Sequence, residues 1–347
     1  MTAAQDPARH LQVGQRRIVV WGAGSWGTAL ALHLAKSGHE VSLWVYEAEQ
    51  FEAMRRSGEN ADFLPGFPLP PNIGLFHDPA QVPPGAFAWL SVSPTQATRA
   101  LWRTIGPLCP PEALIISASK GFEQGTLLSP SAVIEACAPA ACHPVVALSG
   151  PSFAHGLASG DPTTVALAAP DLWRAEVTQR LVSHRPLRGY VSGDRVGVEL
   201  GGAVKNVVAL ACGIAAGLGF GPNTIAALIT RGLREIVRLG ERMGADPHTF
   251  AGLSGMGDLV LPCTGEESRN RTVGVRLGKG ERLDQILGSM KMVAEGVPTT
   301  RSVADLARKH GVEMPIAFIV ERILFQDLPP RDALDQLLSR ELKREIG

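Results

Sequence analysis

A glycine-rich turn between two apolar segments constrains the fold of this chain more than any other feature. The turn reads Gly22-Ala23-Gly24-Ser25-Trp26-Gly27, which is the pattern G-x-G-x-x-G. An apolar run, residues 17–21, precedes it, and an Ala- and Leu-rich segment of helical length, residues 28–36, follows it. Residues 41–45 form a second apolar run. Strand, turn, helix and strand in this order predict a βαβ unit.

The three glycines of this turn have separate roles in a dinucleotide-binding unit. The first, Gly22, permits the tight turn. The second, Gly24, lets a pyrophosphate approach the backbone, and the third, Gly27, lets helix and strand pack closely. The helix N-terminus presents free N–H groups and partial positive charge to the same anion. The sequence therefore predicts a dinucleotide site at this turn.

Short apolar runs continue through the first half of the chain and then give way to long helical segments. Further strands are expected at residues 86–92, 114–117, 145–148 and 164–167, and helices at 95–105 and 127–136. Later helices are expected at residues 197–218, 224–243, 301–310, 316–325 and 332–346. The fold class is α/β, with a Rossmann-like domain built on a mainly parallel sheet, residues 1–192, followed by an all-α substrate and catalytic domain, residues 193–347.

Composition excludes several classes of partner. Lys plus Arg equals Asp plus Glu at 33 each, so nothing indicates binding to nucleic acid or to an anionic membrane. The longest apolar run, residues 207–220, is too short to span a bilayer and predicts a buried helix, and the polar N-terminus lacks the apolar stretch of a signal peptide. Five cysteines without a C-x-x-C pair, and nine histidines without metal-ligand spacing, predict a reduced, cytoplasmic protein without a metal.

One lysine lies inside an otherwise uncharged helical run. Lys205 precedes Val207 and Val208, and Gly201 and Gly202 lie one turn before it. We expect the two glycines to leave room for a ligand on the same helix face. Because burial disfavours an ammonium, this lysine is expected to titrate nearer neutrality and to exchange a proton with a hydroxyl. The alternative is a lysine that extends from a buried helix to solvent.

Three other segments carry candidate ligand-binding groups. Asp258 lies in a glycine-rich turn, where it could hold a substrate hydroxyl, orient Lys205 or cap a helix. Lys120 follows an expected strand at the carboxyl edge of the sheet, where open α/β sheets bind ligands. Residues 268–271, Ser-Arg-Asn-Arg, precede an expected helix. Arginine forks beside a helix N-terminus suit a phosphate, whereas the alternative is a solvated basic turn.

The end of the second strand predicts the adenosine side of the dinucleotide site. NAD-specific sites usually carry an acidic residue there, and Glu47 is placed to serve the ribose. Tyr46 could stack on adenine, and its alternative is a plain surface aromatic. After this strand, the first arginines that could bind the 2′-phosphate of NADP are Arg55 and Arg56. The cofactor is therefore NAD or NADP, and the residues leave both open.

The sequence resembles the bacterial NAD(P)-dependent glycerol-3-phosphate dehydrogenases over nearly its whole length. The resemblance rests on the order and spacing of several stretches. These are residues 22–30, 119–123, 148–154, 197–206, 227–233, 255–261, 263–265, 268–271 and 293–296. Two departures stand out. Relatives usually carry Arg or His at the position of Tyr46, and a Val-Pro-Ser turn where this chain has Val92-Ser93-Pro94-Thr95.

The resemblance implies a role for each matching residue. Lys205 is implied to be the proton acceptor. Substrate contacts are implied for Lys120, Gly150, Ser152, Lys205, Asp258, Ser268, Arg269 and Asn270. Cofactor contacts are implied for Ser25, Trp26, Lys120, Ala154, Arg269, Val293 and Glu295. They add to the candidates given above for the cofactor, which are Gly22, Gly24, Gly27 and Tyr46. A homodimer is implied as well.

The implied reaction is reversible hydride transfer between NAD(P)H and dihydroxyacetone phosphate, a small-molecule substrate, supplying glycerol 3-phosphate for phospholipid synthesis. Two alternatives stay open. One is a dehydrogenase of the related β-hydroxyacid type, which shares the two-domain plan and a lysine next to an asparagine. The other is a nucleotide-sensing module without turnover, against which the retained Lys205 and Asp258 argue.

Overall fold

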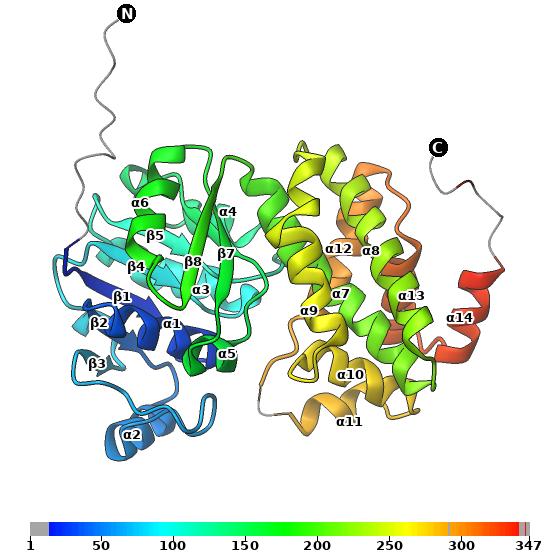
Figure 1. Ribbon diagram of the computed structural model, residues 1–347, viewed down its shortest axis with the longest axis horizontal. Coiled ribbons are helices and arrows are strands. Elements are labelled where there is room, and N and C mark those ends of the chain that lie inside the picture. Colours follow the sequence, from blue (N-terminus) through cyan, green and yellow to red (C-terminus); the bar gives the residue numbers. More distant parts are fainter. Residues whose placement is uncertain (1–13, 291, 340–343, 345–347) are drawn as a thin grey trace, which may run out of the picture.

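An eight-stranded sheet occupies the first half of the chain in the computed structural model, which describes residues 14–290, 292–339 and 344 (Figure 1). The strands are β1 (Arg17–Trp21), β2 (Glu40–Trp44), β3 (Ile73–Phe76), β4 (Ala88–Ser91), β5 (Leu114–Ser117), β6 (Val146–Ser149), β7 (Thr163–Ala168) and β8 (Leu187–Ser192). Their spatial order is β3-β2-β1-β4-β5-β6-β7-β8. All neighbouring pairs are parallel except β6 with β7. The expected mainly parallel sheet is confirmed.

Helices cover the sheet, as its parallel strands require. They are α1 (Ser25–Lys36), α2 (Ala48–Ser57), α3 (Thr95–Ile105), α4 (Pro130–Glu135), α5 (Ala154–Ser159) and α6 (Leu172–Val182). The central strands are buried on both faces, with every residue of β4, β5 and β6 buried. Such strands read as continuous apolar runs, which is why the sequence identifies them.

Several elements of this half differ from expectation. The helix expected at residues 127–136 begins only at Pro130, because Leu127 has a left-handed backbone with φ +60° and proline without an N–H fits the first helical turn. The sequence also missed α2, α5, α6 and the two outermost strands. The edge strand β8 alternates buried and exposed residues and contains Gly189, so it lacks the apolar run of a central strand.

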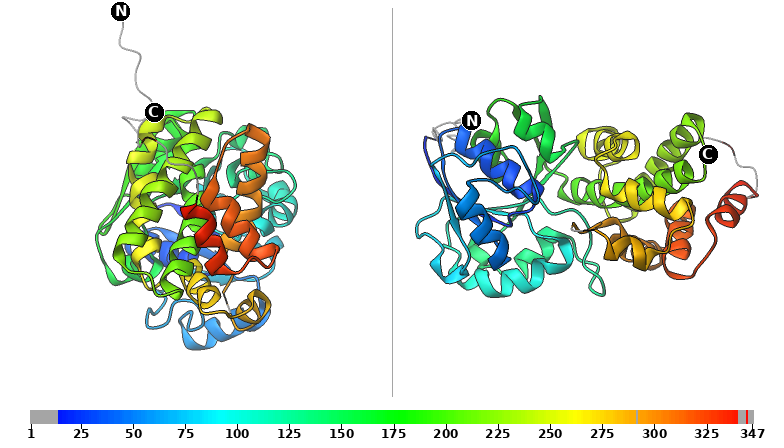
Figure 2. Two further views of the ribbon diagram at one scale, coloured as in Figure 1. Left: turned by 90° about the vertical axis from the view of Figure 1, so that its right-hand side faces the viewer. Right: turned by 90° about the horizontal axis from the view of Figure 1, so that it is seen from below.

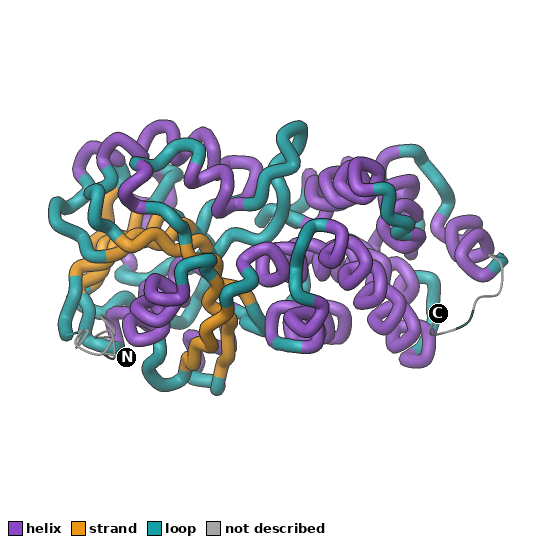
Figure 3. The backbone as a smooth tube through the Cα atoms, turned by 90° about the horizontal axis from the view of Figure 1, so that it is seen from above, coloured by secondary structure: helices purple, strands orange, loops and turns teal. Residues whose placement is uncertain are grey.

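The second half is helical (Figure 3). Its helices are α7 (Arg195–Gly217), α8 (Pro222–Arg242), α9 (Asp258–Thr264), α10 (Arg269–Gly278), α11 (Leu283–Gly288), α12 (Gly296–His310), α13 (Pro315–Phe325) and α14 (Pro330–Leu338). The helix expected at residues 224–243 begins two residues earlier, at Pro222. A proline there is favoured because its missing N–H has no partner in a first turn. The end of the helix expected at 332–346 lies outside the described residues.

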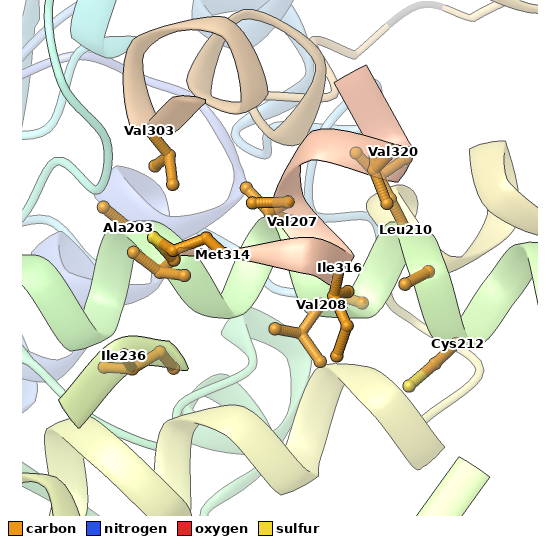
Figure 4. Close-up of a cluster of buried hydrophobic side chains, with 14 of the residues drawn as sticks. Ala203, Val207, Val208, Leu210, Cys212, Ile236, Val303, Met314, Ile316 and Val320 are labelled. Carbon is orange, nitrogen blue, oxygen red and sulfur yellow. The ribbon is translucent and has the colours of Figure 1, made fainter. Parts of the chain in front are cut away.

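Helix α7 forms the centre of this half. Side chains from α8, α12 and α13 gather around it in one apolar cluster (Figure 4). By length and composition α7 could cross a membrane, but 83% of its most apolar 18-residue window is buried inside the protein. It is therefore a core helix, as the sequence predicts.

Helices α7 and α10 cross at close range through glycines. A Cβ atom on Gly213 would lie 2.2 Å from the carbonyl oxygen of Arg271, and one on Gly217 would lie 2.2 Å from that of Val275. The facing positions are also glycines, Gly274 and Gly278, each with a Cα 2.9–3.0 Å from those same Cβ positions. The two backbones therefore pack directly against each other.

Only two residues separate the last strand from α7, since β8 ends at Ser192 and α7 begins at Arg195. The sheet-bearing half and the helical half lie side by side along the long axis of the molecule (Figure 2). Arg195 forms an ion pair with Glu135 of α4, and Ser129 donates to the buried carboxylate of Glu199 at 2.8 Å. These contacts hold the start of α7 against the sheet-bearing half.

Candidate active site

The glycine turn after β1 has the shape of a dinucleotide cradle. Gly22 has a φ of +124°, and a Cβ there would lie 2.6 Å from the carbonyl oxygen of Val92. A Cβ on Gly27 would lie 1.9 Å from the carbonyl oxygen of Gly22. At Gly24, by contrast, no atom of the described residues lies within 4 Å of the Cβ position. The first and third glycines serve protein packing, and the second faces open space where a pyrophosphate fits.

Helix α1 begins at this turn. Its N-cap residue, Gly24, has no side chain to satisfy the first N–H groups, so they are left for a bound anion. Trp26 packs against the core of the sheet. Ser25 donates a hydrogen bond to the Met292 sulfur at 3.5 Å. The loop before α12 thus reaches from the helical half to the glycine turn.

The residues expected on the adenosine side lie after β2. Tyr46 is 68% exposed and meets Trp44 edge-on at 5.6 Å between ring centroids. Its outer face is free for stacking within the described part of the chain. Glu47 is the N-cap residue of α2 in extended conformation. Arg55 pairs with Glu52 at 3.5 Å.

A buried cluster of two lysines and one aspartate joins the two halves. Lys120 follows β5, Lys205 lies in the middle of α7, and Asp258 begins α9. The Lys120 ammonium donates to Asp258 Oδ2 at 2.5 Å, and the Lys205 ammonium donates to Asp258 Oδ1. Lys205 is 9% exposed and Asp258 is 0% exposed. The predicted burial of Lys205 is confirmed, and neither extension to solvent nor helix capping by Asp258 occurs.

Burial and the neighbouring charges shift the pKa values of this cluster in opposite directions. Burial lowers the pKa of Lys120 to about 8, against the attraction of Asp258. Burial would raise the pKa of the Asp258 carboxyl, but the charges of Lys120 and Lys205 outweigh it and hold that pKa below its usual range. The expectation for Lys205 considered burial alone and omitted this carboxylate, which accepts a hydrogen bond from the Lys205 ammonium.

The glycines one turn before Lys205 do not leave room for a ligand, contrary to expectation. A Cβ on Gly201 would lie 2.1 Å from the carbonyl oxygen of Ser254, and one on Gly202 would lie 2.4 Å from Ser149 Oγ. Protein atoms fill both spaces. Gly202 lets α7 approach the end of β6, and Gly201 lets it approach the segment before α9, so Lys205 comes to lie at the edge of the sheet.

The loop after β6 completes the setting of Asp258. Ser149 Oγ and the Gly150 N–H donate to Asp258 Oδ2 at 3.1 and 3.3 Å. The Gly150 carbonyl accepts hydrogen bonds from the Lys120 ammonium at 3.1 Å and from Ser152 Oγ at 3.0 Å. Ala154 begins α5 shortly after. Gly150, Ser152 and Lys120 therefore lie together, whereas Ala154 lies further along this loop.

The expected phosphate grip lies at the start of α10. Ser268 is the N-cap residue, and its hydroxyl accepts the Arg271 N–H at 3.2 Å. The exposed Arg269 donates to the Val293 carbonyl at 3.0 Å. Asn270 uses both amide atoms, since Nδ2 donates to Asn206 Oδ1 at 2.9 Å and Oδ1 accepts the Gly296 N–H at 2.9 Å. Asn270 therefore also ties α10 to α7 and to α12.

Val293 and Glu295 lie on the loop that leads into α12. Val293 is 52% exposed, and Glu295 Oε1 accepts the Thr95 N–H at the start of α3 at 3.1 Å. Burial raises the pKa of Glu295, although the Thr95 N–H and the charge of Arg269 oppose it. This loop brings the helical half over the carboxyl edge of the sheet.

The sequence did not single out Ser149, Thr95, Met292 or Asn206. Their contacts span from 64 to 267 residues along the chain. Single residues without a motif carry no signal of such contacts. Asn206 is the exception, because its position directly after the expected buried Lys205 could have drawn attention to it.

A dinucleotide cradle that faces a buried lysine across the junction of two domains is the arrangement of a nicotinamide-dependent dehydrogenase. Comparison with known proteins narrows this class. The chain belongs to the NAD-dependent glycerol-3-phosphate dehydrogenase family, since the N-terminal region of that family matches residues 17–175 and the C-terminal region matches residues 194–335.

Individual relatives agree with this assignment. A protein of Geobacter sp. (strain M21) named glycerol-3-phosphate dehydrogenase (NAD(P)+) is 52% identical over 330 residues, which cover 95% of this chain and 98% of that protein. The Geobacter sulfurreducens protein of the same name is 50% identical over 332 residues, covering 95% and 98%. The crystal structure of glycerol-3-phosphate dehydrogenase from Coxiella burnetii superposes with a TM-score of 0.89 at 39% identity, covering 94% of this chain and 99% of that one.

Proposed function

We propose that this chain interconverts sn-glycerol 3-phosphate and dihydroxyacetone phosphate with NAD(P) as cofactor. The observation that carries the proposal is the Lys120–Asp258–Lys205 cluster, which holds two ammonium groups in a buried position between the dinucleotide cradle and the helical half. The bound nicotinamide supplies or accepts the hydride. The chain itself must bind the substrate, orient it and move one proton.

Lys205 is the group that moves the proton. In the direction of ketone reduction its ammonium donates a proton to the substrate oxygen as negative charge develops there, and in the reverse direction its amine accepts the hydroxyl proton. Asp258 holds the Lys205 nitrogen in place through a charge-assisted hydrogen bond.

Lys120 orients the substrate oxygen and offsets its charge. With both lysines charged and Asp258 ionised, the cluster carries one net positive charge, which favours an anionic substrate and a developing alkoxide. Gly150 and Ser152 line the same loop and serve as substrate contacts.

The start of α10 binds the phosphate. Ser268, Arg269 and Asn270 form the first turn of this helix, and within the described residues the backbone N–H groups of Arg269 and Asn270 have no hydrogen-bond partner. Backbone N–H groups, a helix N-terminus and an arginine fork together suit a phosphate dianion. This grip distinguishes a phosphorylated substrate from the β-hydroxyacids of the alternative hypothesis.

The remaining assignments complete the proposal. Residues 1–192 form the cofactor-binding domain and residues 193–347 the catalytic domain, acting as a homodimer in the cytoplasm and supplying glycerol 3-phosphate for phospholipid synthesis. All five cysteines carry free thiols, in keeping with a reducing compartment. Size-exclusion chromatography with light scattering tests the dimer.

The decisive experiment follows NADH and NADPH absorbance separately with dihydroxyacetone phosphate, using wild type and Lys205→Ala. Wild type should oxidise at least one cofactor, and the variant should lose roughly 10²–10⁴-fold in turnover, the range of general acid–base catalysis, while still binding cofactor. Turnover of a β-hydroxyacid but not of dihydroxyacetone phosphate would favour the β-hydroxyacid dehydrogenase. Tight nucleotide binding without turnover of either substrate would favour the nucleotide sensor. Unchanged turnover in the variant would remove Lys205 from its role.

A further inference from the structure

A hollow of about 380 Å³ lies where the first turns of α3 and α12 meet. Thr95 and Thr299 line it from the two helices, and Val293 and Glu295 line it from the loop before α12. The lining is mainly apolar, with few polar groups. Such a space suits a flat, largely apolar group that carries a small polar substituent.

Two hydroxyl groups at this hollow lack a partner. Thr95 is 2% exposed and Thr299 is 1% exposed, and neither Oγ1 has a hydrogen-bond partner in the described part of the chain. Both approach one point, since a Cβ on Gly121 would lie 2.8 Å from Thr95 Oγ1 and 3.0 Å from Thr299 Oγ1. A buried hydroxyl without a partner is unfavourable, so a ligand that bonds to it gains affinity.

Other threonines on the same helices behave differently. Thr98 of α3 donates to the Pro94 carbonyl at 3.3 Å, and Thr300 of α12 donates to the Gly296 carbonyl at 2.7 Å. Bonding to the preceding turn is the usual solution for a helical threonine. Thr299 forgoes it although its neighbour Thr300 uses it, and Thr95, as the first residue of α3, has no preceding helical turn to bond.

The hollow lies between the cofactor cradle and the buried lysines. Thr95 follows β4 by four residues, and the Cβ position of Gly22 in the cradle lies 3.5 Å from the Ser93 nitrogen on that connection. On the other side, Gly121 directly follows Lys120. The hollow is therefore adjacent through the backbone to both the cradle and Lys120, the two places that a bound nicotinamide ring would connect.

We propose that Thr95 and Thr299 bind the carboxamide of the nicotinamide ring together with Glu295, and so fix which face of the ring meets the substrate. A primary carboxamide has one acceptor oxygen and two N–H donors. The two hydroxyls donate to its oxygen, and the Glu295 carboxylate accepts one of its N–H groups. The proposal rests on the proposed function, because it assumes that the bound dinucleotide carries a nicotinamide.

Binding measurements on the full chain test this role without relying on turnover. The probes are NADH and ADP-ribose, which has the same adenosine and pyrophosphate but no nicotinamide, titrated calorimetrically against wild type, Thr95→Val and Thr299→Val. Each variant should bind NADH about 5- to 10-fold more weakly and ADP-ribose as wild type does. Thr95→Ser, which keeps a hydroxyl, should recover most of the loss. Thr104→Val, an exposed position on α3, is the matched control and should change neither affinity.

An oxidised analogue with an acetyl group in place of the carboxamide separates the two kinds of contact. It keeps the carbonyl oxygen but loses the N–H groups, so wild type should bind it more weakly than NAD+. Both valine variants should bind it more weakly still, by about the factor that each variant loses in affinity for NAD+. Unchanged NADH affinity in both valine variants would mean that the hydroxyls hold buried water only. Equal losses for NADH and ADP-ribose would assign them a structural role.

Thermal melts check that each variant is folded, and either threonine position alone decides the matter if the other variant fails to fold. Failure of the proposed function looks different. Wild type would then leave dihydroxyacetone phosphate unreduced, whatever the affinities of the threonine variants for NADH and ADP-ribose.

Discussion

Lys120 donates a hydrogen bond to the buried carboxylate of Asp258 across the junction between the sheet-bearing half and the helical half of the chain. The other oxygen of that carboxylate accepts from Lys205. One acidic group therefore places two ammonium groups from different halves at a fixed separation. Removing it would leave two largely buried ammonium groups without a counter-charge.

Asp258→Asn should consequently shift the pH dependence of the reaction. The attraction of Asp258 raises the pKa of Lys120, whereas burial lowers it to about 8. Without the negative charge that pKa falls further, so Lys120 loses its proton at lower pH and the alkaline limb of kcat/KM moves to lower pH. The free energy of unfolding should fall by about 3–5 kcal/mol, as for other broken buried ion pairs.

A pH–rate profile and a urea titration measure these two effects. Asp284→Asn, at an exposed ion pair with Arg282, is the control and should leave the pH profile in place. An alkaline limb that stays where it is in Asp258→Asn would contradict the electrostatic role of this carboxylate.

Arg269→Ala should weaken the binding of dihydroxyacetone phosphate more than that of the cofactor. Loss of a charge-assisted contact to phosphate costs about 2 kcal/mol, or roughly 30-fold in affinity. KM for dihydroxyacetone phosphate and direct titration with NADH measure the two effects. Lys279→Ala, an exposed cation at the other end of α10, should change neither. Unaltered affinity for the phosphate substrate in Arg269→Ala would show that the phosphate binds elsewhere.

Tyr46→Arg should move cofactor preference toward NADPH. The tyrosine is exposed at the end of β2, and a guanidinium there could pair with a 2′-phosphate that the phenol cannot bind by charge. We expect the ratio of kcat/KM for NADPH over NADH to rise about tenfold, equivalent to about 1.4 kcal/mol. A Tyr46→Phe variant, which adds no charge, should keep the wild-type ratio. If the ratio in Tyr46→Arg also stays constant, the adenosine side lies elsewhere.

The protein should lose stability in acid partly through His33. Burial lowers the pKa of this histidine below its ordinary value of 6.5, against a hydrogen bond with the Val182 carbonyl. The unfolded chain therefore binds a proton more readily, so the stabilising effect is complete above pH 6.5 and is lost as pH falls through the folded pKa.

Urea unfolding between pH 8 and pH 5 tests this expectation. His33→Gln should flatten the fall in unfolding free energy over that range relative to wild type. His248→Gln, at an exposed position, should not. Equal slopes in wild type and His33→Gln would exclude the histidine as a source of acid sensitivity.

The sequence predicted those parts of the molecule whose cause is local. The glycine turn, the central strands and the burial of Lys205 each follow from a run of neighbouring residues. The edge strands β3 and β8 could not be predicted in this way, because partly exposed strands lack a continuous apolar run. Gly201 and Gly202 were misjudged for a related reason. A glycine signals a close approach, but the sequence alone does not say whether a ligand or another part of the chain approaches.

Contacts across the junction could not be predicted at all. The bond from the Thr95 N–H to Glu295 and the bridge from Asn206 through Asn270 to Gly296 join segments far apart in the chain. They exist only once the two halves are packed together. The residue roles carried over by resemblance supplied Glu295 and Asn270, but not their partners.

The glycine crossing of α7 and α10 has a consequence for which molecules can react. The proposed base, Lys205, stands on one of these helices, and the proposed phosphate grip opens the other. Since backbone touches backbone at Gly213 and Gly217, repacking of side chains cannot change the spacing of the two helices. We therefore expect this crossing to favour substrates of one length between phosphate and reacting carbon, without contacting the substrate itself.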